Sequence, residues 1–234
     1  MQAAVVTVGD ELLSGDTENT NATWLCRELT DRGVDVQRVF TIPDDVGDIA
    51  QVVNESRAKY DAVLVTGGLG PTHDDLTMEG VAAAFGRDVE QNEEAARWLT
   101  EHGGYAAGDL VAGTTHLPVG VRVLHNEAGV APGCVLESVY VFPGVPTEMK
   151  AMFAKVADEF DGEVQHVEFV HAGEPESKLV DRFAELRERF DDVQVGSYPG
   201  EHVRVKLSGP DASVVADAAD WLRERVDPPE EASD

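Results

Sequence analysis

The chain has 234 residues, of which 45 are acidic, 18 are basic and 42% are hydrophobic, so its formal net charge is −27 with the histidines neutral. This length is enough for one large domain or two small ones with a buried core. The acidic excess excludes a nucleic-acid backbone or an anionic lipid surface as a partner, and without an apolar run of spanning length or a basic leader we expect a cytoplasmic protein that contacts no membrane.

The first 85 residues alternate between strand and helix patterns. Short apolar, β-branched runs predict buried strands, at residues 3–8, 34–42 and 62–65. Apolar residues at helical spacing predict helices, at residues 21–32, 46–60 and 76–85. A polar loop is expected at 9–20. This order favours a doubly wound, parallel α/β sheet.

The next segment is less regular. We predict helices at 90–101 and 146–160, with a glycine-rich connection at 103–120 between them. Short strands are expected in the same part of the chain, at residues 121–124, 134–136 and 140–142. The first domain is placed at residues 1–163.

The remainder reads as a smaller α+β domain at 164–226. Its order is strand, helix, strand, strand, helix, at residues 164–170, 176–190, 193–197, 203–207 and 212–226. Residues 227–234 carry two prolines and four acids, so we expect a disordered acidic tail.

Three polar segments leave strands at the edge where an open α/β sheet binds its ligands. They are residues 9–15 (GDELLSG), which are followed by Asn19 and Asn21, residues 42–45 (IPDD) and residues 66–77 (TGGLGPTHDDLT). The glycines of the third segment allow a close backbone approach, and its amides and the following helix favour an anion. Its spacing fits neither a Walker A loop nor a Rossmann fingerprint.

Adjacent carboxylates at Asp74 and Asp75 close this loop, and Asp44 and the pair at 10–11 are expected at neighbouring strand ends. Since carboxylates beside an anion site require a cation, these oxygen ligands predict a Mg²⁺-type site. The alternative is that one acid only caps the helix at 76. His73 is a candidate acid or base, or a solvated loop residue.

Simpler interpretations remain for the first segment. The acids at 10–11 are also typical of the first turn of a helix, and Asn19 and Asn21 of a cap. Two later loops add weaker candidates. Residues 143–150 (PGVPTEMK) offer backbone amides and Glu148, and residues 126–133 (NEAGVAPG) are too glycine-rich for regular structure.

These motifs occur in one order, and together they resemble the N-terminal domain of the CinA (competence/damage-inducible) family, which is similar to molybdopterin-binding domains of the MoaB/MogA type. The resemblance covers residues 1 to about 160. It implies a three-layer α/β/α fold with a mostly parallel sheet. It also implies that residues 164–226 form the small KH-type domain that follows in CinA proteins.

The resemblance implies a nucleotide or pterin ligand at the glycine loop. It further implies hydrolysis of ADP-ribose at its pyrophosphate, with Mg²⁺, Mn²⁺ or Co²⁺, and Asp44 and Asp75 as the functional pair. We therefore expect a hydrolase that takes a small phosphorylated ligand. The alternatives are a molybdopterin-binding or transfer protein of molybdenum cofactor biosynthesis and a non-catalytic nucleotide-binding assembly module. A homo-oligomer is expected.

The predicted site has three parts. The catalytic residues are Asp44 and Asp75, and the metal ligands are Asp44, Asp74 and Asp75. The ligand-binding residues are Gly9, Asp10, Glu11, Ser14, Asn21, Thr66, Gly67, Gly68, Gly70, Pro71, Thr72, Asn126, Gly129, Gly144, Pro146 and Glu148.

The chain departs from the resembling family in three respects. The amidase domain of full-length CinA proteins has no counterpart here, so deamidation is not expected. Relatives often carry basic residues before the Leu-Pro turn, where this chain has residues 111–116 (VAGTTH). The KH-like unit lacks a Gly-x-x-Gly clamp and is acidic, which argues against RNA binding.

The net charge is several-fold larger than solubility requires of a small domain. We predict a stand-alone, haloarchaeal type of protein, because concentrated salt shortens the Debye length to about 3 Å at 1 M and screens self-repulsion. A generically soluble protein is the alternative. Cys26 and Cys134 lie too far apart to suggest a disulfide framework or a metal site, and are expected as reduced thiols.

Overall fold

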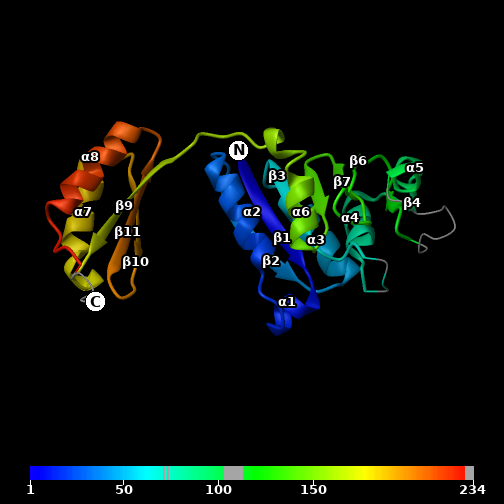
Figure 1. The fold of residues 1–234 in the computed structure, drawn as a ribbon, viewed down its shortest axis with the longest axis horizontal. Coiled ribbons are helices and arrows are strands. Elements are labelled where there is room, and N and C mark those ends of the chain that lie inside the picture. The colour runs from blue at the N-terminus through cyan, green and yellow to red at the C-terminus, as the bar shows by residue number, and fades with distance from the viewer. Residues whose placement is uncertain (71, 73, 103–112, 230–234) are drawn as a thin grey trace. The chain divides into compact units, whose positions relative to one another are not determined.

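The computed structural model describes residues 1–70, 72, 74–102 and 113–229. It divides into two compact units, residues 1–162 (the large unit) and residues 163–234 (the small unit) (Figure 1). Each unit has its own hydrophobic core.

Within the described part of the large unit, six strands form one sheet in the order β2-β1-β3-β8-β7-β6. Their bounds are β1 (Gln2–Val8), β2 (Asp35–Ile42), β3 (Ala62–Thr66), β6 (Arg122–Leu124), β7 (Gly133–Leu136) and β8 (Val139–Phe142). The first four in the order run parallel, with Val5 opposite Val39 on one side and Leu64 on the other, while β7 is antiparallel to both of its neighbours. The predicted α/β fold with a mostly parallel sheet is confirmed.

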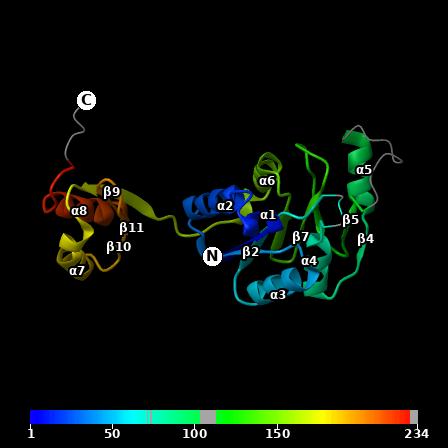
Figure 2. The ribbon, with the colours of Figure 1, turned by 90° about the horizontal axis from the view of Figure 1, so that it is seen from below.

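Helices cover both faces of this sheet (Figure 2). On one face lie α2 (Thr20–Asp31) and α6 (Pro146–Phe153), and on the other lie α3 (Val46–Arg57) and α4 (Thr77–Phe85). Successive strand residues point to opposite faces, so Val5 packs in the first core and Val6 in the second. The sheet therefore lies buried between two helical layers.

The loop expected at 9–20 contains a short helix, α1 (Asp10–Ser14), which ends at Gly15 in the left-handed conformation. The helix expected at 90–101 begins later. Residues 89–91 form β4 (Val89–Gln91), and α5 (Glu93–His102) follows because the Asn92 side chain accepts a hydrogen bond from Ala95 N at 3.0 Å and caps it.

The glycine-rich connection is also partly structured, since β4 pairs antiparallel with β5 (His116–Pro118). Residues 103–112, which include Val111 and Ala112, lie outside the described part. The helix expected at 146–160 ends at Phe153, where the chain tightens into i→i−3 hydrogen bonds before the 3₁₀ helix η1 (Ala157–Glu159).

The small unit packs two helices against one face of an antiparallel sheet. Among its described residues the strand order is β10-β11-β9. Its elements are β9 (His166–Ala172), the 3₁₀ helix η2 (Glu176–Lys178), α7 (Val180–Arg189), β10 (Gln194–Tyr198), β11 (Val203–Gly209) and α8 (Ala212–Arg223). Alternate residues of β11, such as Val205 and Leu207, are buried against the helices. The likeness to a KH-type domain stays a prediction.

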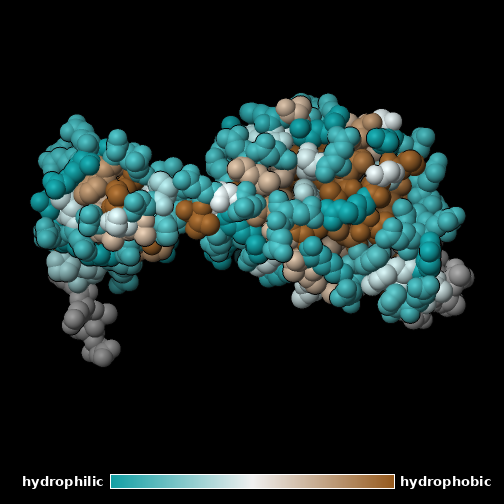
Figure 3. Space-filling view, turned by 90° about the horizontal axis from the view of Figure 1, so that it is seen from above, coloured by the Kyte–Doolittle hydropathy of each residue, from teal (hydrophilic) through white to brown (hydrophobic). Residues whose placement is uncertain are grey.

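Hydrophilic residues predominate on the face seen in Figure 3, and hydrophobic residues gather in patches, the larger of them on the large unit. No helix in residues 1–70, 74–102 or 113–229 combines the length and apolar composition needed to cross a bilayer. Of the expected acidic tail, residues 230–234 lie outside the described part. Residues 227–229 are in neither a helix nor a strand.

Candidate functional site

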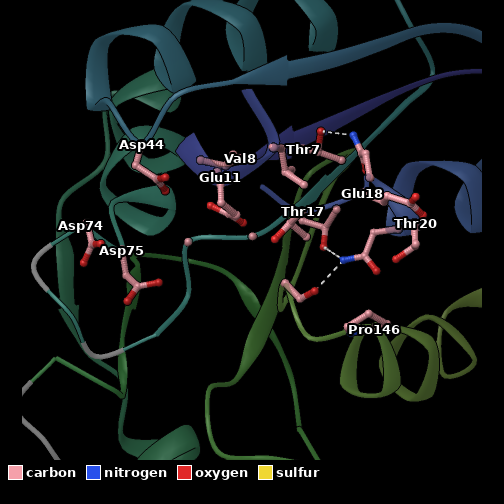
Figure 4. A pocket seen from close by; sticks show the side chains of 18 residues that line it. Thr7, Val8, Glu11, Thr17, Glu18, Thr20, Asp44, Asp74, Asp75 and Pro146 are labelled. Atoms are coloured by element: carbon pink, nitrogen blue, oxygen red, sulfur yellow. Dashed lines mark hydrogen bonds between the residues drawn. The ribbon is translucent and has the colours of Figure 1, made fainter. Parts of the chain in front are cut away.

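A pocket of about 240 Å³ lies where four parallel strands, β1, β2, β3 and β8, end. Figure 4 shows three aspartates at one end of it, Asp44, Asp74 and Asp75, and Glu18, Thr20 and Pro146 at the other. Eleven of the predicted site residues line it: Gly9, Glu11, Asn21, Asp44, Thr66, Gly67, Gly68, Asp74, Asp75, Gly144 and Pro146. The topology thus brings together side chains from segments far apart in sequence.

The acidic end of the pocket concentrates negative charge around Asp44. Its Oδ2 accepts a hydrogen bond from Asp10 N at 3.0 Å. Burial raises the pKa of this carboxyl, and the charges of Asp10, Glu11 and Asp75 raise it further, against the lowering effect of that backbone hydrogen bond. A cation bound here would relieve this repulsion.

The glycine loop after β3 approaches the end of β1 too closely for any side chain. Gly67 has φ +109°, and a Cβ atom there would lie 2.1 Å from the Val8 carbonyl oxygen. Gly68 has φ +59°, and its Cβ would lie 2.5 Å from Thr77 Oγ1, which is buried without a hydrogen-bond partner in the described part of the chain. Both positions therefore require glycine.

The loop uses some of its own N–H groups internally. Gly67 N donates to the Phe142 carbonyl at 3.2 Å, and Gly70 N donates to Asp75 Oδ1 at 2.7 Å. In this conformation both amides are therefore engaged inside the protein, and their predicted role in ligand binding stays a prediction. Gly68 N has no acceptor among the described residues, and Gly68 lines the pocket.

Asp75 organises the loop through both of its carboxylate oxygens. Besides Gly70 N, it accepts hydrogen bonds from Thr72 N at 2.9 Å and from the Thr72 hydroxyl. Its carboxylate is not a cap of α4, because no described N–H of α4 donates a hydrogen bond to it. Pro71 and His73 lie outside the described residues.

Apart from Glu18, the polar groups at the opposite end of the pocket are neutral. Asn21 Nδ2 donates to the Gly144 carbonyl at 2.7 Å and to Thr66 Oγ1 at 3.2 Å, while Thr66 Oγ1 donates to the Pro143 carbonyl at 2.7 Å. Asn21 Oδ1 is buried without a partner in the described part. It offers an acceptor to a ligand that donates.

Asn19 does more than the capping that the sequence suggests. Its Oδ1 accepts from Ala22 N at 3.1 Å and caps α2, and its Nδ2 donates to Thr7 Oγ1 at 2.8 Å and to Thr41 Oγ1 at 3.1 Å. It thereby ties α2 to β1 and β2. The pocket has six further lining residues that the sequence patterns did not indicate: Thr7, Val8, Leu12, Thr17, Glu18 and Thr20.

Other predicted ligand-binding residues do not line this pocket. Glu148 accepts a hydrogen bond from Asn126 Nδ2 at 2.7 Å, and its carboxylate fills the space beside Gly129, so these three hold one loop to α6. Ser14 donates to Asp16 Oδ2 at 2.8 Å. These side chains are engaged inside the protein in this structure, and their ligand role stays a prediction.

The remaining predicted residues lie beside the pocket. Asp10 contributes only its N–H to Asp44, and Gly70 and Thr72 line a second cavity of about 370 Å³ that shares Gly68 and Asp75 with the first. In the part of the chain that the structure describes, no three His, Cys, Asp or Glu side chains are grouped so as to hold a metal ion. A preformed protein cage for a metal is therefore not seen there.

Comparisons with known proteins agree with this architecture. Residues 4–161 match a family described as a probable molybdopterin binding domain, and residues 164–231 match the middle domain of FAD synthase. A protein of Archaeoglobus fulgidus is 40% identical over 225 residues, which are 96% of this chain and 97% of that protein. A CinA-like protein of Citrifermentans bemidjiense is 34% identical over 97% of this chain, which spans 58% of that protein.

A solved structure extends the comparison to the fold. The crystal structure of CinA from Thermoplasma acidophilum, described as a protein of unknown function, is 36% identical. It superposes with a TM-score of 0.63 and covers 68% of this chain and 97% of that one. The likeness therefore extends over most of the large unit and its sheet.

Proposed function

Because the chain belongs to the CinA family and carries its molybdopterin-binding domain at residues 4–161, we propose that it hydrolyses a nucleoside diphosphate linkage with a divalent metal ion, with ADP-ribose as substrate. One observation carries this proposal. A glycine loop and the uncompensated carboxylate of Asp44 line the same pocket, at the strand ends where α/β folds bind ligands. An anion and a cation can be held there side by side.

The donors present fit a hard divalent ion. Mg²⁺ prefers oxygen ligands and is usually held by one or two carboxylates together with substrate phosphates and water, so a protein cage is not required. Asp44 is the foremost candidate ligand, and Asp74 lines the same end. Asp75, whose oxygens bind the loop, acts by positioning it.

When bound, such an ion polarises a phosphoryl oxygen and makes hydroxide available near neutral pH. The chain's own part is to hold the substrate. The loop at Gly68 lies against one phosphate, and Asn21 Oδ1 accepts a hydrogen bond from a donor on the ligand. Water adds to one phosphorus while the bond to the bridging oxygen breaks, so that ADP-ribose gives AMP and ribose 5-phosphate.

The small unit supports the same substrate class. Its match is to the middle domain of FAD synthase, and FAD, like ADP-ribose, contains an adenosine diphosphate linkage. FAD is therefore a second substrate to test. The match adds no catalytic group of its own to the proposal.

The test is turnover by the full chain in molar KCl. Incubation with ADP-ribose or FAD and Mg²⁺, Mn²⁺ or Co²⁺ is expected to release AMP, and Asp44→Asn is expected to lower kcat by at least 100-fold. Asp48→Asn, which changes an exposed acid in the first turn of α3, is the matched control and keeps wild-type turnover. Absence of AMP with every metal contradicts the proposal.

The family description favours a second candidate, binding of a molybdopterin-type ligand. Such a ligand also carries a phosphate and would use the same loop. Retention of the pterin on the purified protein, with no metal-dependent turnover of ADP-ribose, would select this function. A non-catalytic assembly module would differ from both candidate functions, since Asp75→Asn would then change neither ligand binding nor turnover.

A further inference from the structure

An open groove of about 430 Å³ adjoins the end of the pocket opposite the three aspartates. It shares Glu18, Asn19 and Thr20 with the pocket and continues along α2, ending at α6, with Thr23, Trp24, Arg27 and Lys150 as its further walls. Glu18 and Thr20 lie at that end of the pocket in Figure 4. The two hollows are therefore parts of one continuous surface.

The groove is unusual in its charge. It holds two bases, Arg27 and Lys150, against one acid, Glu18, in a chain whose acids outnumber its bases 45 to 18. Neither base forms an ion pair with any residue that the structure describes. Six other bases in the same part of the chain are paired with acids, and the rest, like Arg27 and Lys150, are not.

A tryptophan fixes the position of one of these charges. Lys150 Nζ lies over the Trp24 ring, 5.5 Å from its centre, and the centres of the Trp24 and Phe153 rings lie 5.4 Å apart with their planes at 89°. Trp24 is half-buried and rigidly backed, so it forms an apolar wall with a cation above it. Arg27 follows Trp24 by about one helical turn and extends the same wall.

We propose that this groove is a second subsite, which binds a phosphate group of the ligand whose other part occupies the pocket; the assignment rests on the proposed function. Arg27 supplies a planar fork of donors and Lys150 a point charge, the two side chains that recognise phosphate in complementary ways. Glu18, on the shared rim, disfavours an anion there and separates the two subsites.

The spacing restricts the ligand class. Asn21 lines the pocket and Arg27 lines the groove. The two residues are six positions apart on α2, which is about 9 Å along the helix axis. A ligand that uses both subsites must carry its phosphate about that far from the group bound beside Asn21. A nucleotide with a further phosphate on its ribose meets this requirement, whereas ADP-ribose, whose two phosphates share one bridging oxygen, fills only the pocket.

The test uses the full chain labelled with 5-fluorotryptophan, because the sequence contains three tryptophans and two of them, Trp98 and Trp221, lie outside the groove. The Trp24 signal in the ¹⁹F spectrum is assigned with Trp24→Phe. Titration with inorganic pyrophosphate, at the lowest KCl concentration that preserves the fold, is expected to shift this signal saturably and to leave the other two unchanged.

Replacing both bases, in Arg27→Gln/Lys150→Gln, is expected to weaken this binding at least tenfold. Lys59→Gln is the matched control, because Lys59 is exposed and lies over Tyr60 at 5.4 Å, away from the groove. The subsite is overturned if the Trp24 signal does not shift with pyrophosphate, or if the double variant binds pyrophosphate as tightly as the wild type. A Trp24 response in a protein that releases no AMP from ADP-ribose refutes the proposed hydrolysis and leaves the subsite standing.

Discussion

At the scale of single residues, two glycines that both have a positive φ predict different outcomes. Gly67→Ala would place a Cβ 2.1 Å from the Val8 carbonyl oxygen, whereas at Gly86, with φ +60°, an added Cβ meets nothing within 4 Å. We expect Gly86→Ala to cost about 1 kcal/mol, from left-handed backbone strain. Gly67→Ala should cost at least twice that and abolish ligand binding, because β1 and the loop must separate.

Chemical denaturation of both variants, with ligand titration, measures this difference. Gly86→Ala should bind like the wild type, since Gly86 only ends α4. Equal losses of stability in the two variants would show that the close approach of the loop to β1 is not tight. Position 67 would then require glycine only because of its positive φ.

Asp44 predicts a dependence of stability on pH. Its pKa is raised above 3.8 in the folded protein, mainly by burial and then by neighbouring acids. A raised folded pKa means that this carboxyl stabilises the fold below its unfolded pKa, and that this contribution is lost as pH rises through the folded value. In EDTA at pH 7, Asp44→Asn should therefore raise Tm, although with a divalent ion present the same substitution lowers activity.

The gain in Tm should vanish below about pH 3.8, where the wild-type carboxyl is protonated in both states. Added Mg²⁺ should raise the Tm of the wild type and leave that of Asp44→Asn unchanged, because the ion and the substitution relieve the same repulsion. Thermal melts over pH and metal concentration test both statements. A lower Tm for Asp44→Asn at pH 7 would contradict them.

At the scale of elements, sequence patterns predict the central sheet well. β1 and β3 consist mostly of apolar and β-branched residues, and every one except Gln2 is buried, because both faces are covered. Short elements could not be predicted in this way, because they bury little surface. Residues 89–91 carry a strand of three residues with little buried surface, and its pairing with β5 at 116–118 is a distant contact that no local pattern encodes.

The residues of the candidate site likewise fall into those that the sequence could locate and those that it could not. Asp44, Asn21 and Gly68 could be located because each directly follows a strand or begins a helix, and parallel strands end at a common edge. The sequence could not predict that Asn126, Gly129 and Glu148 contact one another. A glycine-rich loop beside an acid has the same pattern whether it binds a ligand or another loop.

Within the small unit, Glu174 joins elements that are distant in sequence. Its side chain, 4% exposed, pairs with Arg182 of α7 and accepts a hydrogen bond from Asp227 N at 3.2 Å, after α8. The hydrogen bond from Arg182 lowers the pKa of Glu174. Its stabilising contribution is thus present above the unfolded pKa near 4.5 and is lost as pH falls through the folded value.

We therefore expect Glu174→Gln to destabilise the small unit by about 1–3 kcal/mol at pH 7, and by less in acid. Glu224→Gln is the control, because its pair with Arg225 is exposed and worth under about 1 kcal/mol. Hydrogen exchange of β9 and β11 amides measures the loss where it occurs. Equal exchange in both variants would contradict this role.

At the scale of the whole molecule, the net charge of −27 dominates. Self-repulsion destabilises a compact acidic protein, and salt screens it within a Debye length of about 3 Å at 1 M. We expect the free energy of unfolding to rise steeply between 0.1 M and 2 M KCl. A protein equally stable at both concentrations would contradict adaptation to concentrated salt.

The central claim is that a diphosphate binds at the end of β3, between the glycine loop and Asp44. The most direct measurement is a crystal structure of the protein with ADP-ribose and a divalent ion. The account predicts a phosphate against Gly68, with the ion between that phosphate and Asp44. A diphosphate bound elsewhere, or Asp44 turned away from an occupied pocket, would contradict it.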